Sequence, residues 1–87
     1  MHVIVVYDTA QERNPQILRT CRRYLHHVQR SVFEGQLSPA QLRRFQKDVS
    51  DFLDHGYDHV IVYTLPPGAE LRRHTIGLDK PAPSDIL

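Results

Sequence analysis

The pattern of apolar and polar positions contains two nearly continuous apolar runs, which predict two buried strands in this chain. Residues 2–8, HVIVVYD, are β-branched and almost all apolar, which is typical of a strand covered on both faces and central in its sheet. Asp8 stands at the carboxyl end of this strand. Residues 58–65, DHVIVYTL, have the same character, and the turn Pro66-Pro67-Gly68 follows them.

A first helix is predicted from Asn14 to about His27. Asn14 supplies an N-cap, and Pro15 takes the first helical position, where no backbone N–H is needed. Apolar and basic side chains occupy opposite sides of this helix. The apolar stripe consists of Ile17, Leu18, Cys21, Tyr24, Leu25 and Val28, and the basic side consists of Arg19, Arg22, Arg23 and His26.

A second helix is predicted between Ser38 and Gly56. The segment Ser38-Pro39-Ala40-Gln41 matches a capping box, with proline in the first turn and glutamine placed to reach back to the cap. Gly56 is placed to stop the helix in the left-handed conformation. The apolar face of this helix consists of Leu42, Phe45, Val49, Phe52 and Leu53.

The remaining segments have weaker patterns. Residues 28–37, VQRSVFEGQL, are extended in character, with Gly35 as a bulge or bend, and the pattern fits one bent strand as well as two short ones. Residues 71–77 can form a shorter strand. Residues 78–87 contain two prolines and are expected to be an extended C-terminal arm outside a domain of residues 1–77.

Helices that alternate with strands through short connections predict an α+β fold of the ferredoxin-like β-α-β-β-α-β kind, with two helices on one face of an antiparallel sheet. The other face would leave Val3, Val5, Val60 and Val62, or else their alternates, in water. A second copy related by a two-fold axis is the simplest cover. We therefore predict a homodimer whose two sheets face each other.

The composition agrees with one small domain of a globular protein. The 87 residues are 40% apolar and 24% charged, which excludes disorder and a disulfide scaffold as general descriptions. No apolar stretch approaches the roughly 20 residues of a membrane span. The single cysteine, Cys21, lies on the apolar stripe and is expected in the core. We expect a cytoplasmic protein in a reducing compartment.

The order of the charges is more informative than the net charge of +1. Residues 13–30 contain five arginines and no acid, whereas acids gather later in the chain, which suggests a polyanion as the ligand of one face. The guanidinium fork binds phosphate oxygens bidentately, although a charged helix face is often only solvated. The predicted nucleic-acid contacts are Arg13, Arg19, Arg22, Arg23 and Arg30.

Two other features bear on chemistry. His55 and His59 have the spacing of some zinc ligands, but Gly56 interrupts the helix that would align them and no second ligand pair exists, so zinc is not favoured. In the second helix the basic residues precede the acids Asp48, Asp51 and Asp54, an order that opposes the helix dipole. This order suggests a partner protein at the acidic end.

Five segments together resemble the CRISPR-associated protein two family, the small nuclease-like subunit of the CRISPR adaptation machinery. The most specific combination is Tyr7-Asp8 with Ser31-Val32-Phe33-Glu34-Gly35. The matching segments are VIVVYD ending in Asp8, the arginine-rich helix, VQRSVFEG at 28–35, VIVYTL at 60–65 and RHTIG at 73–77. The resemblance implies a ferredoxin-like homodimer in which Asp8 of both protomers reaches one Mg²⁺ or Mn²⁺ position near the two-fold axis.

The resemblance also implies a function in spacer acquisition for antiviral defence, as a metal-dependent endonuclease that acts on RNA or on double-stranded DNA. Asp8, Ser31 and Phe33 are the implied catalytic residues, and Asp8 is the implied metal ligand. The plainer alternatives are that Asp8 caps a turn, Ser31 bonds to backbone and Phe33 belongs to the core. The alternative function is a non-catalytic scaffold that binds DNA and bridges dimers of the CRISPR integrase, CRISPR-associated protein one.

Overall fold

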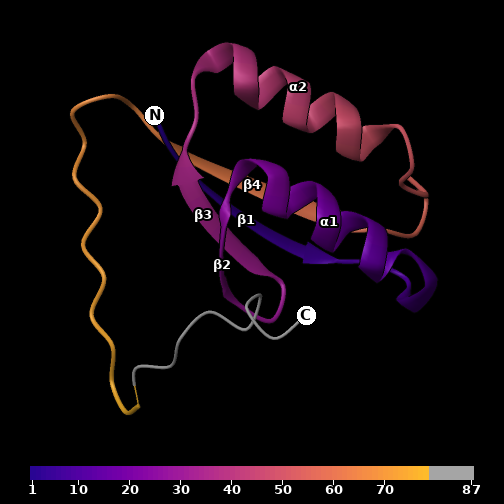
Figure 1. The fold of residues 1–87 in the computed structure, drawn as a ribbon, viewed down its shortest axis with the longest axis horizontal. Coiled ribbons are helices and arrows are strands. Elements are labelled where there is room, and N and C mark those ends of the chain that lie inside the picture. The colour runs from indigo at the N-terminus through magenta and orange to yellow at the C-terminus, as the bar shows by residue number, and fades with distance from the viewer. Residues whose placement is uncertain (79–87) are drawn as a thin grey trace.

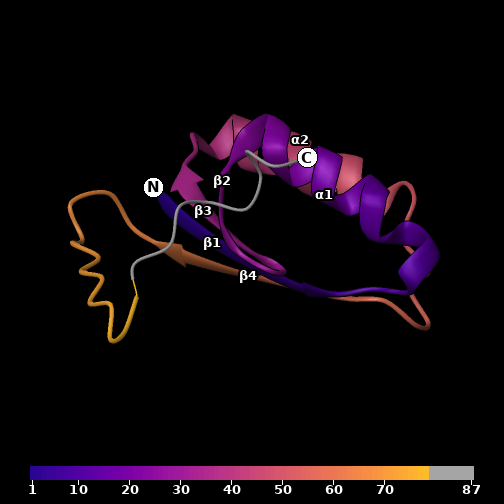
Figure 2. The ribbon, with the colours of Figure 1, turned by 60° about the horizontal axis from the view of Figure 1, so that its bottom comes forward.

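Four antiparallel strands form one sheet, and two helices cover one of its faces (Figures 1 and 2). The computed structural model describes residues 1–78, so the predicted arm lies, apart from Leu78, outside the described residues. The sheet order is β2-β3-β1-β4, which confirms the ferredoxin-like prediction. The elements are β1 (His2–Asp8), a 3₁₀ turn η1 (Gln11–Arg13), α1 (Asn14–Tyr24), β2 (His26–Gln29), β3 (Val32–Gln36), α2 (Pro39–Ser50) and β4 (His59–Leu65).

Strand β1 is central, as predicted, and its helix-facing side anchors the core. Val3 and Val5 are fully buried, and Val5 lies opposite the equally buried Phe33 of β3. Burial raises the pKa of the Cys21 thiol to about 12, in agreement with its predicted place in the core. The buried apolar residues are Val3, Val5, Ile17, Cys21, Leu25, Phe33, Leu37, Phe45 and Val49.

The opposite face of the sheet has no cover from residues 1–78 of this chain (Figure 2). The alternates of the buried valines, Ile4 and Val6, are only half-buried there. Their cross-strand neighbours on β4 are Tyr63, which is 53% exposed, and Ile61. The sequence predicted that both faces of residues 2–8 are covered. Within residues 1–78, only one of these faces is covered.

Residues 28–37 belong to two strands, not to one bent strand. A β2–β3 hairpin turns at Arg30 and Ser31, and its bulge lies between His27 and Gln29. The predicted bulge at Gly35 is wrong. Gly35 pairs regularly with Val3, and a Cβ there would lie 3.1 Å from Leu25 Cδ2, so glycine serves a close approach of the chain to the core.

The first helix differs from its prediction at both ends. Asn14 is helical and does not cap: its Oδ1 accepts a hydrogen bond from Thr9 Oγ1 at 2.6 Å, and the chain enters the helix through η1. The helix ends at Tyr24 and does not reach His27. Leu25 is extended with φ −134° and is buried in the core, which directs the next residues into β2.

The second helix begins as predicted and ends earlier. Ser38 Oγ accepts from Gln41 N at 3.1 Å while Ser38 N donates to Gln41 Oε1 at 2.8 Å, so the capping box is present. The predicted stop at Gly56 is wrong, because α2 ends at Ser50 and positive φ occurs among the described glycines only at Gly68 and Gly77. Gly56 N instead donates to Asp54 Oδ1 at 3.0 Å.

The segment after β4 leaves the domain (Figure 1). The turn at Pro66-Pro67-Gly68 is confirmed by a bond of 3.1 Å from Ala69 N to Pro66 O and by φ +87° at Gly68. The predicted strand at residues 71–77 is wrong within the described chain, since these residues pair with no strand and Ile76 is 99% exposed. No helix of residues 1–78 has the length and apolar character of a membrane span.

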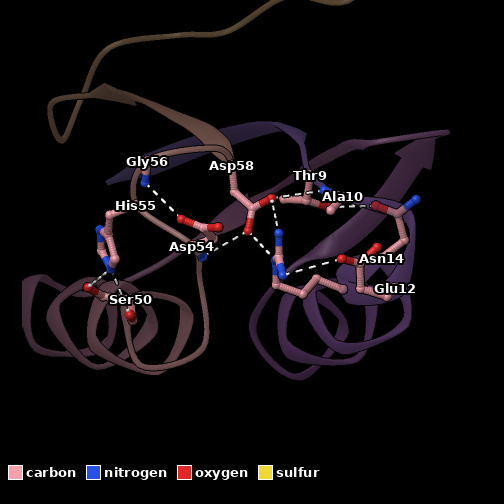
Figure 3. A network of polar contacts seen from close by, with 10 residues as sticks. Thr9, Ala10, Glu12, Asn14, Ser50, Asp54, His55, Gly56 and Asp58 are labelled. Atoms are coloured by element: carbon pink, nitrogen blue, oxygen red, sulfur yellow. Dashed lines mark hydrogen bonds and ion pairs between the residues drawn. The ribbon is translucent and has the colours of Figure 1, made fainter.

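One buried carboxylate connects the two sequence-distant loops at the end of the molecule (Figure 3). The fully buried Asp58 accepts hydrogen bonds from Ala10 N at 2.8 Å, from Asp54 N at 2.9 Å and from Arg13 Nη2 at 3.1 Å. Arg13 Nε donates to Asp58 Oδ2, whereas Arg13 Nη2 donates to Oδ1. These bonds, above all those of Arg13, lower the pKa of Asp58 from 3.8 to about 2 against the opposing effect of burial.

The first prediction concerns Asp58→Asn. Because the folded-state pKa lies below the unfolded value, the stability from Asp58 is fully present above about pH 4 and is lost as the pH falls through about 2. The variant should therefore melt more than about 5 °C below the parent at neutral pH, and the gap should narrow between pH 4 and 2. Thermal unfolding followed by circular dichroism measures both effects.

Asp51→Asn is the matched control, since Asp51 is exposed and pairs only with Lys47 at 3.1 Å on the same helix surface. It should shift the midpoint by about 1–2 °C or less. Equal midpoints for the parent and Asp58→Asn at every pH would show that the Asp58 bonds do not hold these loops together.

Candidate active site at the end of strand β1

The carboxyl end of β1 opens into a hollow of about 730 Å³. Its walls come from the end of β1, the loop that follows, the first turns of α1 and the β2–β3 turn. The lining residues are Tyr7, Asp8, Thr9, Gln11, Asn14, Pro15, Leu18, Arg30 and Ser31. The fold thus brings three of the predicted site residues together, namely Asp8, Ser31 and Arg30.

Asp8 is exposed at the rim of this hollow. Within residues 1–78 its carboxylate has no hydrogen bond or ion pair, so it does not cap the turn before the helix; Asp58 and Asn14 bond that loop instead. Because side chains alternate between the two faces of a strand, Asp8 belongs to the same uncovered face of the sheet as Ile4 and Val6. The carboxylate therefore stands at the border between the hollow and the uncovered face of the sheet.

The β2–β3 turn presents Arg30 and Ser31 to the hollow. Arg30 has φ +41°, the one positive value at a non-glycine residue in the described part of the chain, a conformation that costs roughly 1 kcal/mol. Its carbonyl accepts a hydrogen bond from His27 Nε2 at 2.5 Å. The Ser31 carbonyl accepts from Tyr7 N at 3.1 Å, which ties the turn to β1 beside Asp8.

Phe33 lies beneath the site and does not line it. Its ring is fully buried between His27, whose centroid is 4.3 Å away at 8°, and Tyr7, at 6.2 Å and 25°. Partial burial of Tyr7 raises the pKa of its hydroxyl. Phe33 thus occupies the core position that the sequence left open as the alternative, and any effect on the site passes through its two aromatic neighbours.

The five predicted nucleic-acid arginines are not equivalent. Arg13 is engaged with Asp58, and Arg23 Nη2 lies 3.6 Å from Asp48. Arg22 is half-buried one helical turn beyond Leu18, a lining residue of the hollow. Arg19 and Arg23 on α1 and Arg30 in the turn are exposed.

The acids of the later cluster have partners within the chain. Asp48 accepts from the Tyr24 hydroxyl at 2.6 Å, which raises the pKa of Tyr24 and joins α1 to α2. Asp51 pairs with Lys47, as an i,i+4 pair. His55 Nε2 lies 2.9 Å from the Ser50 carbonyl, so this histidine is used at the end of α2 rather than in a zinc pair with His59.

The residues of the hollow are compatible with the coordination that Mg²⁺ prefers in proteins. The ion takes one or two carboxylates and keeps several waters, and Asp8 offers one unpartnered carboxylate per chain in an open setting. Among residues 1–78 no three His, Cys, Asp or Glu side chains converge on one point. A site with two carboxylates would need its second carboxylate from outside this group of residues.

The sequence did not predict that two histidines, His27 and His59, lie near the site. His59 lies directly opposite Asp8 in the pairing of β1 with β4, a position that only the strand register reveals. His27 was placed in the helix by its apolar neighbours, whereas it belongs to β2. The turn at Arg30 and Ser31 contains no Gly, Pro, Asn or Asp, so the local sequence gives only a weak signal for the true position of His27.

Known proteins resemble this chain in sequence. Residues 1–72 match the family model of the CRISPR associated protein Cas2. A protein of Frankia alni named CRISPR-associated endoribonuclease Cas2 is 53% identical over 78 residues, which are 90% of this chain and 90% of that protein. A Thermotoga maritima protein of the same name is 38% identical over 80 residues, with 92% of each chain covered.

Solved structures resemble it in fold. A Cas2 crystal structure superposes with a TM-score of 0.78 at 38% identity and covers 92% of this chain and 90% of that one. The crystal structure of Streptococcus pyogenes Cas2 at pH 6.5 superposes with a TM-score of 0.75 at 29% identity, with 88% and 100% covered. The match of the family model and the extent of these identities establish that the chain belongs to the Cas2 family of CRISPR-associated proteins.

Proposed function

We propose that the protein is a metal-dependent endonuclease of the CRISPR adaptation machinery that hydrolyses phosphodiester bonds at the hollow beside Asp8. The observation that carries this proposal is the Asp8 carboxylate, which has no partner among residues 1–78, at a hollow shared with Arg30 and Ser31. RNA is the first substrate to test because relatives are named endoribonucleases, and double-stranded DNA is the second.

Asp8 would hold Mg²⁺, or Mn²⁺, through hard carboxylate oxygens. When bound, such an ion lowers the pKa of a coordinated water and offsets negative charge on the phosphate. The chain's own residues orient the substrate. Arg30 binds phosphate oxygens through its guanidinium fork, and the Ser31 hydroxyl donates to a further oxygen. Tyr7, Pro15 and Leu18 form an apolar part of the wall beside these polar groups.

We also propose that the active form is a homodimer whose open sheet faces meet. The uncovered face carries Ile4, Val6, Ile61 and Tyr63, and apolar patches of this kind are typical of protein interfaces. Asp8 belongs to the same face at the end of β1, so a two-fold axis near that end would bring two Asp8 carboxylates toward each other. One contact surface would then cover the sheet and complete the metal site.

The second prediction tests Asp8 directly. Asp8→Asn keeps the size of the side chain and removes the charge that the metal requires, so Mg²⁺-dependent cleavage of a single-stranded RNA should fall at least about 100-fold while the dimer persists. Asp51→Asn is the control with full activity. Cleavage by Asp8→Asn at the parent rate would assign the reaction to other residues.

The third prediction concerns the dimer. Ile4→Glu places a charge at the centre of the open face, so sedimentation should show a folded monomer where the parent is a dimer. Gln46→Glu introduces the same charge on the exposed surface of α2 and should leave the dimer intact. A monomeric parent at micromolar concentration contradicts both the interface and the shared site.

A second candidate function is a DNA-binding scaffold that bridges dimers of the CRISPR integrase without cleaving. The exposed Arg19 and Arg23 of α1 favour it, because they lie outside the lining of the hollow and yet form a basic surface. Asp8→Asn separates the two functions, since it should spare spacer capture if the protein acts only as a scaffold.

The fourth prediction holds for either function. In Arg19→Gln/Arg23→Gln the slope of log affinity against log salt should fall by about 0.9 for each lost duplex phosphate contact, or about 0.7 on a single strand. Arg43→Gln/Arg44→Gln on α2 is the matched pair. If only the α2 pair changes the slope, the nucleic acid lies along α2 and not along α1.

A further inference from the structure

The β2–β3 turn is held in an unfavourable backbone conformation at the residue that faces the site. Arg30, with φ +41°, is in the left-handed region, where a side chain with a Cβ is disfavoured. Glycine or asparagine would adopt it more readily. Since the chain keeps an arginine there, the surrounding contacts must hold the turn in place.

His27 supplies the contact to Arg30. Its Nε2 lies 2.5 Å from the Arg30 carbonyl, and because a carbonyl only accepts, Nε2 carries the hydrogen. The imidazole is itself immobilised: it is 8% exposed and stacks on Phe33 at 4.3 Å and 8°. Phe33 in turn is fully buried opposite Val5 of the central strand, so the donor is fixed to the core.

The neighbouring residue is fixed from the other side. Tyr7 N donates to the Ser31 carbonyl at 3.1 Å, so both carbonyls of the two-residue turn are bonded, one to β1 and one to His27. The two side chains of the turn line the hollow with Asp8. The bond from His27 is the one that acts on the strained residue.

We propose that His27 is a positioning residue, which donates from Nε2 to the Arg30 carbonyl and thereby aims the Arg30 guanidinium at a nucleic-acid phosphate in the hollow. The inference rests on the proposed function for the identity of that ligand. His27 itself does not line the hollow, so it acts through Arg30 and not by contact with the substrate.

Two substitutions distinguish positioning from packing. His27→Phe keeps an aromatic ring against Phe33 and removes the donor, whereas His27→Gln loses the ring and keeps an N–H group near the place of Nε2. If His27 positions Arg30, His27→Phe should weaken binding of a fluorescein-labelled single-stranded RNA about tenfold, and His27→Gln should weaken it less. A role in packing alone predicts the reverse order.

A double-mutant cycle tests the route through Arg30. Arg30→Ala should weaken binding about as much as His27→Phe, and the double variant should bind no more weakly than Arg30→Ala. His55→Phe is the matched control, because it removes the same kind of bond, from Nε2 to the Ser50 carbonyl at 2.9 Å, on an exposed loop outside the hollow. It should leave binding unchanged.

Binding is measured by anisotropy in EDTA, where cleavage cannot occur, so the result does not depend on the catalytic proposal. Parental affinity of His27→Phe, a greater loss in His27→Gln, or additive losses in the double variant would each overturn the inference. Cleavage by Asp8→Asn at the parental rate would overturn the catalytic proposal alone.

The unaltered protein offers a further measurement that survives poor folding of any variant. Nitrogen-15 NMR of the imidazoles should show His27 as the tautomer with hydrogen on Nε2, in slow exchange with water because the ring is buried. A hydrogen on Nδ1 instead would leave nothing to donate to the Arg30 carbonyl and would refute the proposal.

Discussion

The buried carboxylate of Asp58 is the contact on which the site's geometry depends. It gathers donors from the loop after β1, from η1 and from the loop before β4, and it satisfies backbone N–H groups that no strand or helix can reach. A buried charge is tolerated only when it is paired and hydrogen-bonded, so these bonds form as a set. The loop that begins at Asp8 and Thr9 therefore leaves β1 in one direction, and the mouth of the hollow has a fixed shape.

The other wall of the hollow rests on a different support. The aromatic rings of His27, Phe33 and Tyr7 stack in order from the hairpin to the central strand. At the ends of this stack, His27 Nε2 donates to the Arg30 carbonyl and the backbone N of Tyr7 donates to the Ser31 carbonyl. The contacts that hold Arg30 in its unfavourable backbone conformation therefore come from the core and not from the turn itself. Asp58 positions the β1 side of the hollow and the aromatic stack positions the hairpin side. Asp8 on one side and Arg30 and Ser31 on the other therefore line one hollow.

The sequence predicts those features that depend on near neighbours. The capping box at Ser38, the proline turn after β4 and the apolar strand at residues 2–8 are local, and the structure contains all three. The end of α1 is not local: the apolar stripe continues to Val28 because β2 also buries residues, but Leu25 must be extended to enter the core. Arg13 was expected to bind phosphate since its acidic partner lies 45 residues away, beyond any helical or strand spacing. The pairing of His59 with Asp8 required the register of the sheet.

Strand β1 links stability to the proposed chemistry. Its buried side chains anchor the core, its half-buried ones form the centre of the uncovered face, and the carboxylate of its last residue has no partner among residues 1–78. Period-two alternation makes these three roles inseparable, because a shift of one residue would turn Asp8 away from the open face and Ile4 into the core. Residues 1–78 leave an apolar face without a cover and offer a single carboxylate, that of Asp8, to the proposed metal site. In the proposed dimer, the second copy would cover the apolar face and supply the second carboxylate. Loss of association should therefore also disrupt the proposed metal site.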